Sequence, residues 1–285
     1  ITHHSSLIIH HSSFIIHHSS FIIQSEDISV SKPSLKELLA VAREAAYLGG
    51  RRALTYFNSE LKVELKADAS PVTRADREAE ELIRQRIQRS FPEHSILGEE
   101  GGATQGNASY RWIIDPLDGT KTFVHGVPFF GTLIGIEVEG KPSVGVVYLP
   151  AFDEMIVAAT GFGCQWNDRE AHVSKISRLE DAVLLTTSVT DAQARSDAYN
   201  RLAAKTKLQR TWGDCYGYVL VATGRAEIML DPIMNPWDNA PLLPIMQEAG
   251  GHFTSWDGQA TIWGRDAVAT NAALHEQVLT TLNTE

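Results

Sequence analysis

Cysteine is scarce in this chain, which has only Cys164 and Cys215 among 285 residues. Their spacing fits neither a zinc site nor a disulfide framework, so we expect two buried thiols in a reducing cytoplasm. No apolar run is long enough to span a bilayer, so no membrane segment is predicted. The net charge of −10 argues against nucleic acid or an anionic membrane as a partner. With 43% apolar residues, the sequence can form a full globular core.

The first 23 residues contain no Lys, Arg, Asp or Glu, although they hold six of the eleven histidines. Two identical heptads, residues 9–15 and 16–22, make up most of this segment. Because it lacks a basic start, a secretory signal peptide is not predicted. Paired histidines could bind a transition metal. The repetition and the missing initiating Met instead favour a disordered or non-native extension over residues 1–31, which we exclude from the fold prediction.

We predict that deleting residues 1–31 leaves stability and activity unchanged, because the repeat has no pattern complementary to a folded core. Thermal unfolding and turnover of the truncated and full-length chains test this. A large fall in melting temperature or turnover would mean that the repeat is a real structural element.

The most informative segment is residues 112–120, which read WIIDPLDGT. Its apolar start predicts a buried strand, and Pro116 and Gly119 predict a tight loop after it. Two carboxylates at the end of a strand, Asp115 and Asp118, suit a divalent cation that holds a phosphate, and the glycine exposes backbone N–H groups. For this segment alone, an ordinary Asp-Gly turn remains the alternative.

Further acidic residues lie at the predicted ends of other elements. Glu99 and Glu100 end an apolar stretch, and Asp238 stands where an N-cap would precede a helix over residues 242–249. Asp76 falls in the first turn of a helix with apolar residues at 3.6-residue spacing. Each acid alone could be a cap or could complement a helix dipole. Four acidic clusters at element ends together favour a shared site.

Three separated blocks resemble the inositol monophosphatase superfamily of Mg²⁺-dependent, lithium-sensitive phosphatases. They are G-E-E, then W-I-I-D-P-L-D-G-T, then W-D followed by E-A-G-G. The resemblance runs from about residue 35 to residue 282. It implies an α/β (α+β) fold, a layered α-β-α-β-α sandwich of the sugar-phosphatase type, with two or three Mg²⁺ ions as cofactors and a homodimer.

The resemblance also implies a role for individual residues. The implied metal ligands are Glu99, Asp115, Asp118, Asp238 and the carbonyl of Leu117. The implied substrate contacts are Asp118, Gly119, Thr120, Asp214, Asp231 and Asp238, with Gly119 and Thr120 meeting the phosphate through backbone N–H groups. Asp76 and Thr120 would orient the attacking water, while Glu99 holds the adjacent metal.

This chemistry agrees with elementary electrostatics. A phosphate monoester is anionic and repels hydroxide, whereas bound Mg²⁺ removes that repulsion, lowers the pKa of a water and steadies the leaving oxygen. Mg²⁺ prefers carboxylate and carbonyl oxygens. The D-x-x-D spacing differs from the D-x-D of haloacid-dehalogenase phosphatases, which argues against an aspartyl-phosphate. The chain also lacks the G-x-x-x-x-G-K-[ST] loop, so a P-loop nucleotide hydrolase is not predicted.

The remaining pattern predicts the arrangement of elements. Ser34 and Glu37 form a capping box before a helix over residues 35–57, and residues 131–139 and 144–149 form a hairpin. Strands and helices then alternate, which is typical of layered sheets covered by helices. We divide the chain into residues 32–150, with most metal ligands, and residues 151–285, with substrate contacts and the last ligand.

Several details resemble the histidinol-phosphate phosphatase subgroup. They are Lys121 after Thr120, W-G-D-C-Y-G-Y at residues 212–218 and D-A-V-A-T-N at residues 266–271. Histidinol carries an ammonium and an imidazole, with which Asp214 and Asp231 could pair. Asp214 as a helix cap and Asp231 as a turn residue are the alternatives. We therefore predict hydrolysis of L-histidinol phosphate, a step of histidine biosynthesis.

Three other functions share these features. An inositol 1-phosphate phosphatase has the same metal signature, as has a 3′-phosphoadenosine phosphatase. The latter should add basic or aromatic contacts for a nucleotide, and residues 213–231 offer no evident ones. A phosphate-binding scaffold without activity is the third alternative, because a fold alone does not determine function. Metal-dependent phosphate release separates enzyme from scaffold.

Overall fold

The computed structural model describes residues 32–60, 62–66 and 71–284. The predictions for residues 1–31 lie outside the described residues. From Pro33 onward the chain forms one compact unit. Among the described helices, none combines the length and apolar character needed to cross a bilayer.

Two sheets dominate this unit. The larger has the strand order β10-β9-β8-β7-β6-β5-β3-β4, and the smaller has the order β12-β11-β13-β15-β14. The larger sheet consists of β3 (His94–Gly98), β4 (Gly102–Thr104), β5 (Asn107–Asp118), β6 (Gly131–Val138), β7 (Lys141–Leu149), β8 (Glu154–Ala159), β9 (Cys164–Trp166) and β10 (Arg169–Glu170). The smaller consists of β11 (Val183–Leu185), β12 (Leu208–Arg210), β13 (Ile228–Asp231), β14 (Gly251–Thr254) and β15 (Ala267–Asn271). The larger sheet thus spans residue 150, where the sequence analysis divides the chain.

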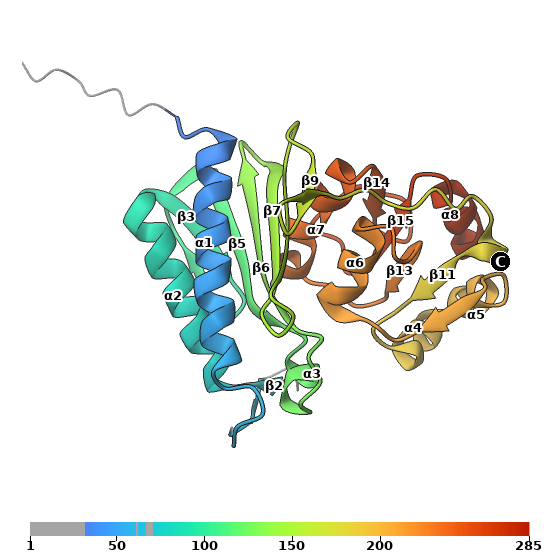
Figure 1. Ribbon diagram of the computed structural model, residues 1–285, viewed down its shortest axis with the longest axis horizontal. Coiled ribbons are helices and arrows are strands. Elements are labelled where there is room, and N and C mark those ends of the chain that lie inside the picture. The colour runs from blue at the N-terminus through green and yellow to red at the C-terminus, as the bar shows by residue number, and fades with distance from the viewer. Residues whose placement is uncertain (1–31, 61, 67–70, 285) are drawn as a thin grey trace, which may run out of the picture. The chain divides into compact units, whose positions relative to one another are not determined.

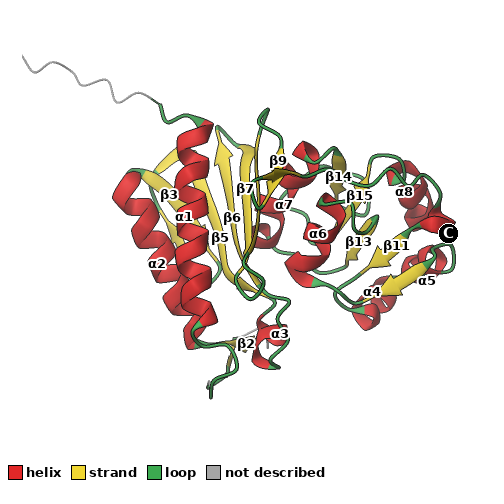
Figure 2. Ribbon diagram, in the orientation of Figure 1, coloured by secondary structure: helices red, strands yellow, loops and turns green. Residues whose placement is uncertain are grey.

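Helices form three layers around the two sheets (Figures 1 and 2). The outer layer on the larger sheet is α1 (Leu35–Leu54) and α2 (Arg74–Ser90), and α6 (Asp214–Ala222) and α7 (Pro236–Glu248) lie between the sheets. The outer layer on the smaller sheet is α4 (Val189–Arg195), α5 (Ala198–Ala203) and α8 (His275–Asn283). The predicted α-β-α-β-α sandwich is confirmed.

Strand β5 is central and buried on both faces. Trp112 and Ile114 pack toward α1 and α2, while Ile113 packs into the core between the sheets. Each of the three side chains is 0% exposed. A strand covered by helices on both faces needs a continuous apolar run, which explains why the sequence predicted it correctly.

The structure confirms the predicted N-cap of the first helix, but the helix ends earlier than predicted. Ser34 and Glu37 form the capping box, but α1 ends at Leu54 rather than near residue 57. Gly49 and Gly50 do not interrupt it. A Cβ atom at Gly49 would lie 2.6 Å from Ile83 of α2, and one at Gly50 would lie 2.6 Å from Tyr148 of β7. These glycines therefore allow α1 to pack closely against its neighbours.

A second pair of glycines lets α7 approach the larger sheet. Gly135 and Gly145 are opposite each other on β6 and β7. A Cβ atom at Gly135 would lie 2.5 Å from Ala240, and one at Gly145 would lie 2.1 Å from the carbonyl oxygen of Pro241. Larger residues would push α7 away from the sheet, because packed interiors leave no spare volume. This contact fixes the start of α7 beside the end of β5.

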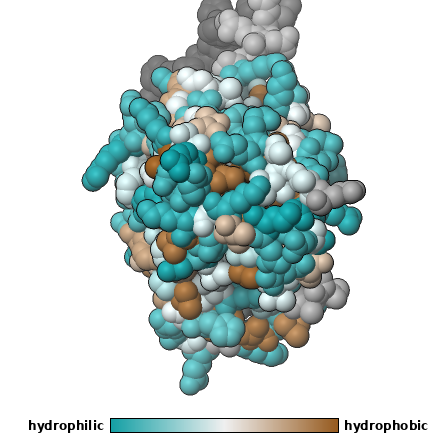
Figure 3. Space-filling view, turned by 90° about the vertical axis from the view of Figure 1, so that its right-hand side faces the viewer, coloured by the Kyte–Doolittle hydropathy of each residue, from teal (hydrophilic) through white to brown (hydrophobic). Residues whose placement is uncertain are grey.

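The predicted elements elsewhere are largely present. The predicted hairpin of β6 and β7 is confirmed, and β8 also pairs antiparallel with β9. Two short strands, β1 (Glu64–Leu65) and β2 (Pro71–Val72), pair antiparallel. A short helix, α3 (Thr120–Val124), follows β5. Seen from the side of the smaller sheet, the surface is mainly hydrophilic, with apolar residues in small separate groups (Figure 3).

Candidate active site

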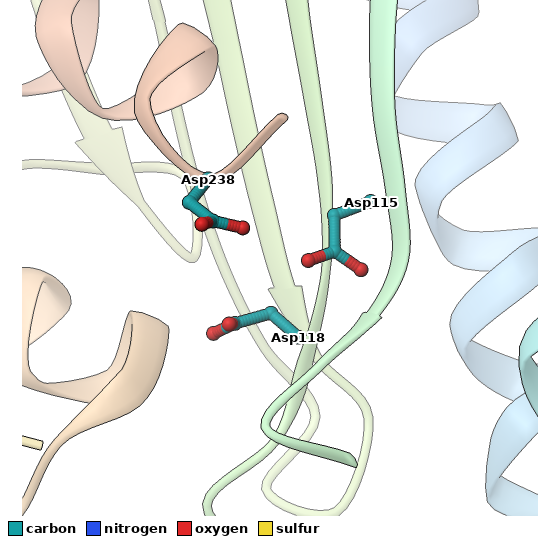
Figure 4. Close-up of side chains that lie close together, drawn as sticks. All are labelled: Asp115, Asp118 and Asp238. Atoms are coloured by element: carbon teal, nitrogen blue, oxygen red, sulfur yellow. The ribbon is translucent and has the colours of Figure 1, made fainter. Parts of the chain in front are cut away.

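Three carboxylates converge between the end of β5 and the start of α7. One oxygen each from Asp115, Asp118 and Asp238 lies within 4.8 Å of the others. Figure 4 shows the three side chains pointing toward one another from β5 and from α7. The structure thus brings together three of the predicted metal ligands, which lie up to 123 residues apart (238 minus 115) in the sequence.

The backbone around the two aspartates of β5 orients their side chains. The pairing of β5 with β6 shifts register between Asp115 and Asp118, so the strand continues with a bulge instead of ending at Ile114 as expected. The N–H of Leu117 donates to Asp115 Oδ1 at 2.9 Å, and the N–H of Cys215 donates to Asp118 Oδ2 at 2.6 Å. Both carboxylates are therefore fixed before any ligand binds.

Gly119 makes the turn from β5 into α3. Its φ of 80° lies in the left-handed region, and a Cβ atom there would lie 2.9 Å from the carbonyl oxygen of Phe129. Both facts require glycine. The turn therefore places the start of α3, with its backbone N–H groups, at the edge of the cavity that the carboxylates line.

Asp238 has a different helical position from the one predicted. The helix α7 begins at Pro236 with Asn235 as its N-cap, so Asp238 is the third helical residue rather than the cap. Its Oδ2 accepts the N–H of Asn235 at 2.7 Å in a capping box. The predicted helix began at residue 242, after Pro241, whereas α7 begins at Pro236 and continues through Pro241.

Burial of like charges raises the pKa of each member of the cluster. Burial is the main cause at Asp115 and Asp118, with further contributions from the charges of Glu99 and Asp214 respectively, and both pKa values lie well above the usual range. Burial, together with the nearby Glu99, raises the pKa of Asp238 to about 7. A cation between these oxygens would reverse these shifts and favour the ionised carboxylates.

Glu99 lines the same cavity but pairs with a lysine in this structure. Its Oε1 accepts Lys66 Nζ at 2.6 Å, and Glu100 Oε1 accepts the same ammonium at 2.6 Å. The turn that carries Glu99 is held by Glu80, which accepts the N–H groups of Glu100 and Gly101. Within the described residues, Glu99 is thus near the three-carboxylate cluster without belonging to it. Sequence reasoning missed Lys66, which gave no signal beyond its charge.

Asp76 and Thr120 meet, as the sequence analysis expected. The Thr120 hydroxyl lies 3.1 Å from Asp76 Oδ1 and 3.0 Å from the carbonyl oxygen of Leu117. The other oxygen of Asp76 accepts the N–H and the hydroxyl of Thr73, which caps α2. Burial raises the pKa of Asp76. Asp76 thus joins a helix cap to the hydroxyl of Thr120, and its part in catalysis stays a prediction.

The carboxylates line a cavity of about 250 Å³, which also contains the two acids expected to contact the substrate. Asp231 is 3% exposed, and it accepts the N–H of Thr187 at 2.8 Å and the hydroxyl of Tyr218 at 3.1 Å. Burial raises its pKa to about 6. Asp214 accepts the Thr122 hydroxyl at 2.7 Å. Asp231 ends β13 and Asp214 starts α6, so neither is the turn residue or the N-cap considered as an alternative.

The profile of the inositol monophosphatase family matches residues 34–285. The chain belongs to this family. It is therefore an inositol monophosphatase-family phosphatase, as the three sequence blocks predicted, and its fold is the family's layered sandwich.

Relatives within the inositol monophosphatase family include proteins named histidinol-phosphatase. The protein from Chlorobaculum parvum is 41% identical over 85% of this chain and 95% of its own length. That from Mycobacterium tuberculosis is 40% identical over 79% of this chain and 89% of its own. Among solved structures, the extragenic suppressor protein suhB from Bartonella henselae has a TM-score of 0.82, with 31% identity over 87% of this chain and 98% of its own.

Proposed function

We propose that this phosphatase hydrolyses L-histidinol phosphate with the help of Mg²⁺, releasing L-histidinol and phosphate. The observation that carries the proposal is the cavity, which joins a cluster of three carboxylates that could hold a metal ion to further acids beside it. The names of the relatives at 40–41% identity support the same substrate. The proposal includes the homodimer and the cytoplasmic setting that the family resemblance implies.

The residues present fit a magnesium centre. Asp115, Asp118 and Asp238 offer only oxygen ligands, and no cationic side chain of the described residues forms an ion pair with them. Glu99 and the carbonyl of Leu117 would complete the set for two or three ions. Bound Mg²⁺ would neutralise the phosphate, favour ionisation of a water and stabilise the leaving oxygen. We expect lithium to inhibit, as in the family that the chain resembles.

Thr120 and Asp76 would prepare the attacking water. The Thr120 hydroxyl has one proton, and its two acceptors are Asp76 Oδ1 and the carbonyl of Leu117. When this proton is donated to Asp76, Thr120 Oγ1 can accept a proton from water, and the Leu117 carbonyl keeps both lone pairs. Asp76 then serves as the general base through Thr120. The N–H groups at Gly119 and Thr120 would bind the phosphate oxygens.

The acids beside the metal ligands support a cationic leaving group. Histidinol carries an ammonium and an imidazole, and Asp214 and Asp231 line the cavity that would receive them. Neutral inositol gains less from these charges. Inositol 1-phosphate remains the second candidate substrate, because the matching family is the inositol monophosphatase family.

We expect Asp214→Asn to weaken the use of histidinol phosphate by roughly tenfold or more, since a charge-assisted contact contributes about 1.5–3 kcal/mol. Asn keeps the shape and tolerates the φ of 49° at this position. The measurement is phosphate release from histidinol phosphate, inositol 1-phosphate and 3′-phosphoadenosine phosphate with Mg²⁺. Equal losses on the cationic and neutral substrates would reduce Asp214 to a structural role. Faster hydrolysis of inositol 1-phosphate by the unaltered chain would overturn the substrate assignment.

A further inference from the structure

A second cavity adjoins the one that holds the carboxylates. It has a volume of about 550 Å³, and some residues line both cavities. The shared residues are Lys121, Thr187, Ser188, Asp191 and Asp214. The leaving alcohol of a substrate whose phosphate lies near Gly119 and Thr120 can therefore extend into this second space.

Two other acids near this boundary, Asp214 and Asp231, already accept hydrogen bonds from the protein. Asp231, which lines only the first cavity, is buried and accepts hydrogen bonds from Thr187 and Tyr218. Asp214 accepts the Thr122 hydroxyl, and the positive charge of Lys121 acts on it. Both acids are therefore held in place by hydrogen bonds within the protein.

Asp191 differs from the other two acids. It lies in the first turn of α4 and is exposed, and its backbone N–H donates to Ser188 Oγ at 3.2 Å. Among the described residues, none donates a hydrogen bond to its carboxylate or forms an ion pair with it. Asp191 thus brings a negative charge without a protein partner to the boundary of the two cavities.

An aromatic side chain lies with Asp191 in the lining of the second cavity. Trp212 lines the second cavity and is 40% exposed. The guanidinium of Arg210 lies 6.0 Å from the centre of its ring, at the outer limit of a cation–π contact. An exposed tryptophan that lines a cavity can contact a flat or cationic ligand group at a small entropic cost.

We propose that Asp191 and Trp212 form the binding site for the cationic part of the leaving alcohol. The ligand class is a phosphate monoester whose alcohol carries an ammonium or an imidazolium group. Asp191 pairs with that cation, and Trp212 packs against the group that carries it. This inference rests on the proposed function and adds to it the residues that select the substrate.

The test compares Asp191→Asn with the unaltered chain on histidinol phosphate and on inositol 1-phosphate, both with Mg²⁺. We expect kcat/KM for histidinol phosphate to fall about tenfold through KM, with kcat nearly unchanged. For inositol 1-phosphate it should change less than about twofold, because this substrate offers no cation. Asp191→Glu should restore part of the loss, and Trp212→Leu should lower kcat/KM for histidinol phosphate about threefold.

Asp168→Asn is the matched control. It removes the same charge from an exposed residue that lines neither cavity, and Asn tolerates its φ of 60°. Its ion pair with Arg43 is exposed, so little stability depends on it. This variant should behave as the unaltered chain on both substrates.

Two contrary outcomes have different meanings. If the unaltered chain prefers histidinol phosphate and Asp191→Asn keeps that preference, or loses activity equally on both substrates, the role of Asp191 is refuted while the proposed function stands. If the unaltered chain prefers inositol 1-phosphate, the proposed function fails, and the inference fails with it.

Discussion

Replacing Asp115 or Asp118 with Asn should lower kcat at least about a hundredfold, because each change removes a ligand charge from the centre that stabilises the reacting phosphate. Phosphate release at saturating Mg²⁺ measures the effect. The fold should survive, since both side chains belong to a buried cluster of like charges whose repulsion Asn relieves. In the absence of Mg²⁺, the melting temperature of each variant should therefore equal or exceed that of the unaltered chain.

Asp168→Asn serves as the control for this experiment as well, because it removes an acid far from the cluster without altering turnover. Excess EDTA should abolish the activity of the unaltered chain, and adding Mg²⁺ should restore it. Full activity in EDTA would refute the metal-dependent mechanism. So would an Asp115→Asn variant with unchanged kcat at limiting Mg²⁺.

Asp76→Asn should lower kcat by about a hundredfold while changing KM much less, since general-base catalysis contributes about 10²–10⁴-fold. Asn retains an oxygen that can accept the N–H of Thr73, so the cap of α2 can persist. Steady-state kinetics together with thermal unfolding separate the two roles of Asp76. A loss of stability with unchanged kcat would leave Asp76 as a cap alone.

Thr120 supplies a matched pair of variants for the same step. Thr120→Ser keeps the hydroxyl that lies 3.1 Å from Asp76 Oδ1 and should keep most of the activity. Thr120→Val has nearly the same shape without the hydroxyl and should lose activity to the extent that Asp76→Asn does. Equal activities of the Ser and Val variants would exclude a proton transfer through Thr120.

The sequence predicted the site best where local pattern and chemistry agree. The apolar run before Asp115 predicted the buried strand, and the acidic residues at the ends of separate elements predicted a shared site. It could not predict the pairing of Lys66 with Glu99, nor the burial of Asp231 beneath Tyr218. Those contacts join different elements of the fold, and neither residue type nor spacing specifies them.

Helix α7 was the main error, and its cause is physical. Prolines at 241 and 244 disfavour a helix in isolation, yet α7 runs through both. Its packing against Gly135 and Gly145 supplies tertiary contacts that outweigh local propensity. A prediction from sequence takes account of this local propensity, but it cannot include the packing of the helix against the sheet. Asp191 was not predicted as a site residue, because nothing near it in the sequence indicates the cavity that it lines.

The glycine pair that receives α7 lies far from that helix in the sequence, which bears on when the site can form. Strands β5 to β7 are synthesised long before residues 236–248, so their face toward α7 stays uncovered while the ribosome adds about the next hundred residues. Contacts over such a separation form slowly, because a long loop must close first. The cluster of carboxylates is therefore completed late, when α7 docks on the two glycines and brings Asp238 to the end of β5. An ion that needs all three carboxylates can thus bind only a chain that has nearly finished folding.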